Sequence, residues 1–127
     1  MLTQSPHKSK PGFSRIMGAA QYSYDGLKVA FRYEAAFRQE LALAMVLIPV
    51  AVVLEVSLLE KALLISSVCF VLIVELLNSA VEAIVDRVSL EYHEFAKRSK
   101  DLGSAAVMFS LLNCAIIWAL VLWERFT

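Results

Sequence analysis

The feature that most constrains the fold is a polar row that begins inside a long apolar segment. Thirteen uncharged residues, Ala62 to Val74, are followed by Glu75, Asn78, Glu82 and Asp86. On an α-helix the three carboxylates fall within roughly 40° of one another along roughly 16 Å, with the amide beside them. Because carboxylates that face lipid are unfavourable, this face of the helix must contact protein or a water-filled cleft.

The amount and clustering of apolar residues indicate an integral membrane protein. Hydrophobic residues make up 59% of the chain and the mean hydropathy is +0.65, whereas soluble domains are about 45–50% apolar. We predict an all-α membrane protein with one domain over residues 1–127 and spans at about residues 35–53, 62–85 and 102–123. The net charge is zero, so nothing indicates a nucleic acid partner, and none is expected.

The segment before the first span predicts an amphipathic helix. Residues 1–12 are polar and are expected to form a disordered tail. Over residues 13–32, apolar side chains recur at spacings of three and four, as on one face of a helix: Phe13, Ile16, Met17, Ala20, Tyr24, Leu27 and Phe31. A basic amphipathic helix beside membrane spans favours the membrane surface. The alternative is a helix packed on other protein.

The distribution of lysine and arginine predicts the orientation. The hairpin of residues 55–61 and the C-terminal tail carry one each, Lys61 and Arg125, whereas residues 86–101 carry four and the N-terminal segment six. Short cytoplasmic segments carry the excess of these residues. The N-terminus and residues 86–101 are therefore predicted to be cytoplasmic, in a multi-pass protein.

Charged residues at the ends of the predicted spans suggest a single site at the cytoplasmic interface. Glu34, Lys100 and Asp101 lie at a depth similar to that of Glu75 and Glu82. Carboxylates suit Mg²⁺, which is commonly held by one or two of them plus substrate phosphates, and one can also serve as a general base. The alternatives are a structural ion-pair network or, for the last two residues before the third span, membrane anchors.

Two further expectations follow from the residues. One three-span chain has too few helices to shield the polar row, so we predict a homo-oligomer. The chain has neither type of glycine-rich phosphate-binding loop, and His93 alone lacks the ligand count of a zinc site, so a solvated loop residue is expected there. The residues alone thus predict a membrane enzyme or an ion-handling protein.

Five segments, in order and at matching spacings, resemble the prokaryotic diacylglycerol kinase family: "EAAFRQE" (34–40), "LLISSV" (63–68), "VELLNSAVEAIVDR" (74–87), "EYHE" (91–94) and "KDLGSAAV" (100–107). The resemblance covers about residues 12–123. It implies a homotrimer in the bacterial inner membrane, with sites shared between subunits. It also implies Mg²⁺-dependent transfer of the ATP γ-phosphate to diacylglycerol, which gives phosphatidic acid.

The resemblance also implies roles for single residues. Glu75 matches the catalytic base, and Glu34 and Glu82 match the carboxylates that hold Mg²⁺ against the nucleotide. Further nucleotide contacts are implied for Arg15, Tyr22, Glu91, His93, Lys100 and Asp101. Contacts to the lipid substrate are implied for Arg15, Ser23, Tyr24, Arg38, Asn78 and Ser104.

Two other functions stay open at this stage. Related family members phosphorylate undecaprenol, and comparing turnover of the two lipids separates the alternatives. A small oligomer that conducts protons or cations would need a continuous polar path. The outer half of the second span opposes this, because Ser66 and Ser67 are its only polar groups between Ala62 and Val74.

Overall fold

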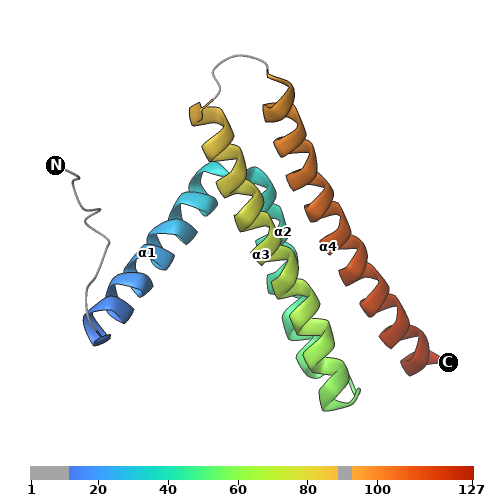
Figure 1. Cartoon of the computed structure of the whole chain (residues 1–127). Helices are drawn as coiled ribbons and strands as arrows, with labels where there is room; N and C mark the ends of the chain where they lie inside the picture. The colour runs from blue at the N-terminus through green and yellow to red at the C-terminus, as the bar shows by residue number, and fades with distance from the viewer. Residues whose placement is uncertain (1–11, 89–92) are drawn as a thin grey trace.

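The computed structural model describes residues 12–88 and 93–127, which form four α-helices. They are α1 (Gly12–Tyr33), α2 (Ala35–Val53), α3 (Leu58–Val88) and α4 (Glu94–Phe126) (Figure 1). The last three are long and apolar enough to cross a membrane. The described residues contain no strand, so the predicted all-α membrane fold is confirmed. The predicted tail lies outside the described residues except for Gly12.

The three long helices form a bundle from which α1 diverges. α3 packs along α4 and also contacts α2, whereas α1 leaves the bundle at the start of α2 (Figure 1). Ala30 is the only buried residue of α1. The apolar side chains of Phe13, Ile16 and Met17 are 77%, 66% and 57% exposed. The predicted helix over residues 13–32 is therefore confirmed, with its apolar face left uncovered by this chain.

The junction between α1 and α2 fixes the position of Glu34. This residue has extended backbone angles, φ −111° and ψ 103°, and its side chain makes no capping hydrogen bond to α2. Arg38 donates from Nη1 to the carbonyl oxygens of Phe31 and Arg32 at 2.9 and 3.1 Å. The last carbonyl groups of a helix lack hydrogen-bond partners within the helix, and Arg38 supplies a donor to two of those at the end of α1. The Glu34 carboxylate is not used to cap either helix, so it remains available for other contacts.

The connection between α2 and α3 is shorter than the predicted hairpin of residues 55–61. Ser57 caps α3: its Oγ accepts from the backbone N–H of Glu60 at 3.1 Å, and the Glu60 carboxylate accepts from the Ser57 backbone N–H at 3.4 Å. This reciprocal pair is a capping box. Lys61 also donates to the carbonyl oxygen of Val52 at 2.7 Å, which joins the end of α2 to the start of α3.

At the opposite end, much of the predicted 86–101 loop is helical. α3 continues to Val88 and α4 begins at Glu94. The ion pairs of Lys97 with Asp101 at 2.6 Å and of Arg98 with Glu94 at 2.9 Å span four residues, a spacing that stabilises helices. The predicted spans 62–85 and 102–123 thus lie inside helices of roughly 46 and 50 Å, which exceed the roughly 30 Å hydrocarbon core.

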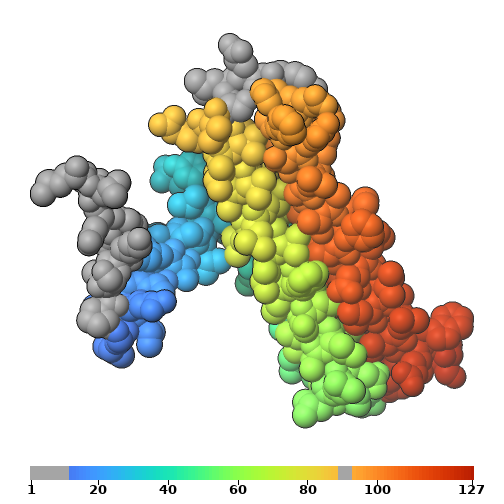
Figure 2. Space-filling view, in the orientation of Figure 1, coloured from blue at the N-terminus to red at the C-terminus, as the bar shows by residue number. Residues whose placement is uncertain are grey.

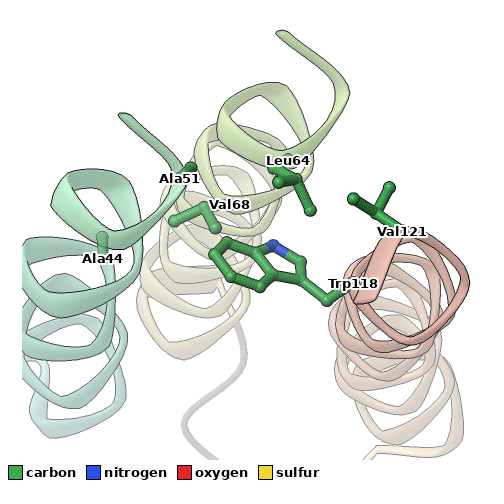
Figure 3. Close-up of a cluster of buried hydrophobic side chains, with 6 residues drawn as sticks. All are labelled: Ala44, Ala51, Leu64, Val68, Trp118 and Val121. Atoms are coloured by element: carbon green, nitrogen blue, oxygen red, sulfur yellow. The ribbon is translucent and has the colours of Figure 1, made fainter. Parts of the chain in front are cut away.

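The largest group of buried apolar side chains lies near the α2–α3 turn. We call it the apolar core, and it joins all three long helices (Figure 3): Ala44, Ala51, Leu64, Val68, Trp118 and Val121. Trp118 extends from α4 toward Val68 of α3 (Figure 3). The alanines of α2 carry small side chains, and such residues allow helices to approach closely within a membrane.

Candidate active site

The polar row lies on α3 and turns toward protein. Glu75 is only 4% exposed, and Asn78 and Glu82 are partly buried. Asn78 donates from Nδ2 to Oε1 of Glu82 at 3.4 Å. Carboxylates are unfavourable against lipid, so the row was expected to face protein. For Glu75, Asn78 and Glu82 a single chain is enough to provide that orientation.

Three other carboxylates lie within electrostatic range of Glu75 or of one another: Glu34 at the α1–α2 junction, Glu40 on α2 and Glu82 on α3. The charges of Glu82 and Glu34 act on it directly, and Glu75 in turn acts on Glu40 of α2. We call these four residues the acidic cluster. Repulsion among them, within partly buried surroundings, favours any cation that reaches the cluster. The junction between α1 and α2 brings Glu34 within electrostatic range of Glu75.

Glu40 is a member of the cluster that the sequence reasoning missed. Its Oε2 atom is buried and has no hydrogen-bond partner among the described residues. Glu40 lies inside the first predicted span, at residues 35–53, but no role was predicted for it. An ionisable residue within a span is a functional candidate by default, and that signal could have identified it.

Lys100 supplies a positive charge next to the cluster. Its Nζ pairs with Oδ1 of Asp86 at 2.6 Å, which links α4 to the end of the polar row on α3. It is also attracted by Glu82. Asp101, the next residue, pairs with Lys97 instead. Of the two residues predicted at this corner, the structure therefore brings Lys100 to the polar row of its own chain, while Asp101 turns along α4.

Two grooves flank the site. The first, of about 590 Å³, lies between α1 and α3, and Figure 2 shows α1 in blue beside α3. Its lining is mostly apolar and includes Ser23, Glu34 and Ser79. The second, of about 460 Å³, lies between the ends of α3 and α4 and is lined by Ile84, Val85, Val88, His93, Phe95, Ala96 and Ser99. One groove thus reaches a cluster carboxylate from the side of α1, and the other lies between the ends of α3 and α4.

The remaining predicted residues are spread over the chain. Ser23 lines the first groove, and its Oγ donates to the carbonyl oxygen of Ala19 at 2.9 Å. His93 caps α4, since its Nδ1 accepts from the backbone N–H of Phe95 at 3.1 Å, so it is not merely a solvated loop residue. Four further side chains are exposed: Arg15, Tyr22, Tyr24 and Ser104. The predicted nucleotide contact Glu91 lies outside the described residues.

The donor groups fit Mg²⁺ that is held jointly with phosphates. Within residues 12–88 and 93–127, no three His, Cys, Asp or Glu side chains are grouped so as to hold a metal ion. Glu34 and Glu82 nevertheless both act on Glu75 from different segments. Proteins usually contribute one or two carboxylates to a Mg²⁺ site, and water and phosphate oxygens occupy the remaining coordination positions.

Comparison with known proteins gives consistent matches along the chain. The sequence model described as "Prokaryotic diacylglycerol kinase" matches residues 21–122. A protein named diacylglycerol kinase from Escherichia coli (strain K12) is 50% identical over 115 residues, which are 91% of this chain and 94% of the relative. One of the same name from Pseudomonas aeruginosa is 52% identical over 121 residues, covering 95% and 98%. One from Helicobacter pylori (strain 26695) is 43% identical over 113 residues, covering 89% and 88%.

Proposed function

The chain belongs to the prokaryotic diacylglycerol kinase family, and we propose that it phosphorylates diacylglycerol with ATP at the acidic cluster. The product is phosphatidic acid. The observation that supports this location of the active site is the burial of Glu75, which is 4% exposed and lies within electrostatic range of other carboxylates. One of these, Glu82, also attracts Lys100. The carboxylates of the cluster can bind a metal ion, the adjacent Lys100 can bind phosphate, and the apolar groove can bind a lipid.

Glu75 is the general base of this proposal. Its carboxylate accepts the proton of the lipid hydroxyl, whose oxygen forms a bond to the γ-phosphorus of ATP. The bond from that phosphorus to the bridging oxygen breaks, and ADP leaves with its electron pair. Phosphoryl transfer asks a protein mainly for positioning and charge stabilisation, so the lipid alcohol can attack directly without a phosphoenzyme.

Glu34 and Glu82 would hold Mg²⁺ together with the nucleotide phosphates. When bound, the ion neutralises charge on the β- and γ-phosphate oxygens. The amide of Asn78 orients Glu82 through its hydrogen bond. Lys100 is suited to contact a phosphate because an ammonium group acts as a point charge for it, and its present partner Asp86 is an exposed carboxylate that phosphate can replace.

Each substrate has a groove that suits it. The largely apolar groove between α1 and α3 fits the upper part of an acyl chain, with Ser23 and Glu34 at its polar positions. The groove between α3 and α4 has an aromatic wall, Phe95, which suits the face of a purine base. The lipid contacts proposed beyond these are Arg15, Tyr24, Arg38 and Ser104, and the remaining nucleotide contacts are Arg15, Tyr22, Glu91, His93 and Asp101.

A homotrimer with shared sites completes the proposal. Asp101 is turned toward Lys97 and does not face the acidic cluster of its own chain. The described residues also leave the apolar face of α1 uncovered. A neighbouring chain can supply each of these missing contacts. The charge distribution supports a cytoplasmic N-terminus in the bacterial inner membrane.

The decisive experiment follows the γ-phosphate. Purified protein in detergent is given radiolabelled ATP with either diacylglycerol or undecaprenol, with and without Mg²⁺. We expect labelled phosphatidic acid, at a rate far above that for undecaprenol and only with the metal present. Faster labelling of undecaprenol would overturn the substrate assignment, and full activity in the presence of a chelator would overturn the metal role.

A second experiment tests the shared site. Glu75→Gln and Asp101→Asn chains are assembled into mixed oligomers, and their activity is compared with that of each variant alone. If different subunits contribute the two carboxylates to one site, some mixed sites are intact and activity returns in part. Mixed oligomers no more active than the better single variant would contradict sharing.

A further inference from the structure

A glycine of α4 lies directly against the side chain of Asn78 on α3. A Cβ atom built at Gly103 would lie 3.3 Å from Cγ and 3.9 Å from Cβ of Asn78, and it would overlap Oδ1. At Gly12, Gly18 and Gly26 a Cβ would meet nothing within 4 Å. Among the residues that the structure describes, Gly103 is therefore the only glycine that leaves room for a specific neighbouring side chain.

The amide of Asn78 lies between Gly103 and Glu82, with one end toward each. Its Oδ1 atom, on the side of Gly103, is buried and has no hydrogen-bond partner among the described residues. Its Nδ2 atom faces Oε1 of Glu82 at 3.4 Å. The reversed amide would place an oxygen against a carboxylate, where no hydrogen can be donated. The α4 backbone thus accommodates the oxygen while the amino group serves Glu82.

We propose that Gly103 is a positioning residue for the kinase reaction, acting through Asn78 to hold the Glu82 carboxylate in place. The inference rests on the proposed role of Glu82 as a Mg²⁺ ligand. Groups that orient a metal ligand strongly affect metal affinity although they do not touch the metal. The absence of a side chain at Gly103 is what permits this orientation.

The structure predicts that an alanine here changes the site more than the fold. The atom in the way is the end of a side chain, not backbone, so the amide can rotate and α3 and α4 can keep their packing. Rotation removes Nδ2 from Glu82. Alanine is also a better helix former than glycine, so the stability of α4 does not fall for local reasons.

The test compares Gly103→Ala with Gly18→Ala, which adds the same methyl group where a Cβ meets nothing within 4 Å. Mn²⁺ binding to each purified protein with a non-hydrolysable ATP analogue is measured by electron paramagnetic resonance, and Mg²⁺ dependence is measured by activity. We expect Gly103→Ala to weaken both by about 10-fold, with the thermal unfolding temperature unchanged or higher. Gly18→Ala should change neither. Unaltered metal binding in Gly103→Ala would overturn the proposal.

A double-mutant cycle shows whether the effect passes through the amide. Asn78→Ala removes the obstacle, so adding Gly103→Ala to it should not weaken metal binding further; coupled residues are non-additive in this way. An equal loss in both backgrounds would mean that Gly103 acts by packing, and it would overturn the proposal.

Glu82→Gln distinguishes failure of this inference from failure of the proposed function. If that variant binds Mn²⁺ normally, the metal role of Glu82 fails, and this inference fails with it. If it binds Mn²⁺ poorly while Gly103→Ala binds normally, the proposed function stands and only the positioning role is lost.

Discussion

The two ends of the helix bundle treat buried polar groups in opposite ways. Beside the apolar core, the hydroxyl of Ser67 is buried and donates to the carbonyl oxygen of Leu64 at 2.8 Å, and the buried Ser110 in the middle of α4 donates likewise to that of Val107 at 2.7 Å. Only the indole N–H of Trp118 lacks a partner there among the described residues. Polar groups at this end are thus mostly satisfied by the helix that carries them.

At the acidic cluster several buried polar atoms have no partner among the described residues. Oε2 of Glu40, Oδ1 of Asn78 and Oγ of Ser79 are buried without a partner among the described residues, and neighbouring carboxylates repel one another. An unpaired buried polar group opposes folding. The same helices therefore hold one end where side chains fit each other and another, the proposed reactive end, where several buried polar groups have no partner among the described residues.

The largest expected effect separates catalysis from stability at the reactive end. Glu75→Gln should lower phosphoryl transfer to diacylglycerol roughly 10²–10⁴-fold, because a general base contributes about that much. The variant should unfold no more easily, since one of the repelling charges is gone. Initial rates with labelled ATP and unfolding in denaturing detergent measure the two effects. Glu124→Gln, on an exposed carboxylate at the other end of α4, is the control; normal turnover in Glu75→Gln would remove it as the base.

The next effect lies in the apolar core and should have the opposite character. Leu64 is fully buried, whereas the adjacent Leu63 is 45% exposed. Leu64→Ala should lower the free energy of unfolding by about 2 kcal/mol, the low end of the range for leucine-to-alanine cavities. The low end is expected because, in lipid, burying a leucine side chain brings packing contacts but little hydrophobic driving force. Unfolding in mixed micelles measures this change. Leu63→Ala should cost much less, and activity per folded molecule should survive both. Equal losses for the two leucines would show that the core does not carry this stability.

A smaller effect tests whether the ion pair between α3 and α4 serves substrate binding. Lys100→Gln should raise the KM for ATP about tenfold, because a hydrogen bond between charged groups contributes that order. The free energy of unfolding should change little, since an ion pair between exposed groups such as Lys100 and Asp86 contributes little to stability. Arg98→Gln is the control, because its partner Glu94 lies on the same helix. A large loss of stability with an unchanged KM would make Lys100 structural.

The helical fold was predictable because long apolar runs in a membrane leave few alternatives. The first span, at residues 35–53, matches α2 as it stands. The other two helices extend beyond their predicted spans because charged residues at spacings of four, such as Glu94 and Arg98, continue a helix into water. Hydropathy detects the part of a helix inside lipid and is insensitive to the part outside it.

Two kinds of site residue could be named from the sequence: those that one helix carries in a row, and those at span ends that share the depth of that row. The spacing of Glu75 and Glu82 places them on one face, and the structure keeps them there. The approach of Glu40 depends on how α2 packs against α3, and the contact of Gly103 with Asn78 depends on how α4 does. No periodicity within a single segment contains these distances, so they become visible only in the folded chain.

The smallest expected effect concerns a signal that is local and was readable. "SLLE", residues 57–60, has the spacing of a capping box, and Ser57 forms it at the start of α3. Ser57→Ala should lower the free energy of unfolding by about 1 kcal/mol, the usual effect of losing such a cap, while kinase activity per folded molecule stays unchanged. Ser57→Asp is the matched control, because it keeps an oxygen that can accept from the helix N–H groups, and it should retain most of the stability. Since Ser57 lies at the end opposite the acidic cluster, a fall in kcat that the aspartate does not restore would show that the two ends are coupled, contrary to the division drawn here.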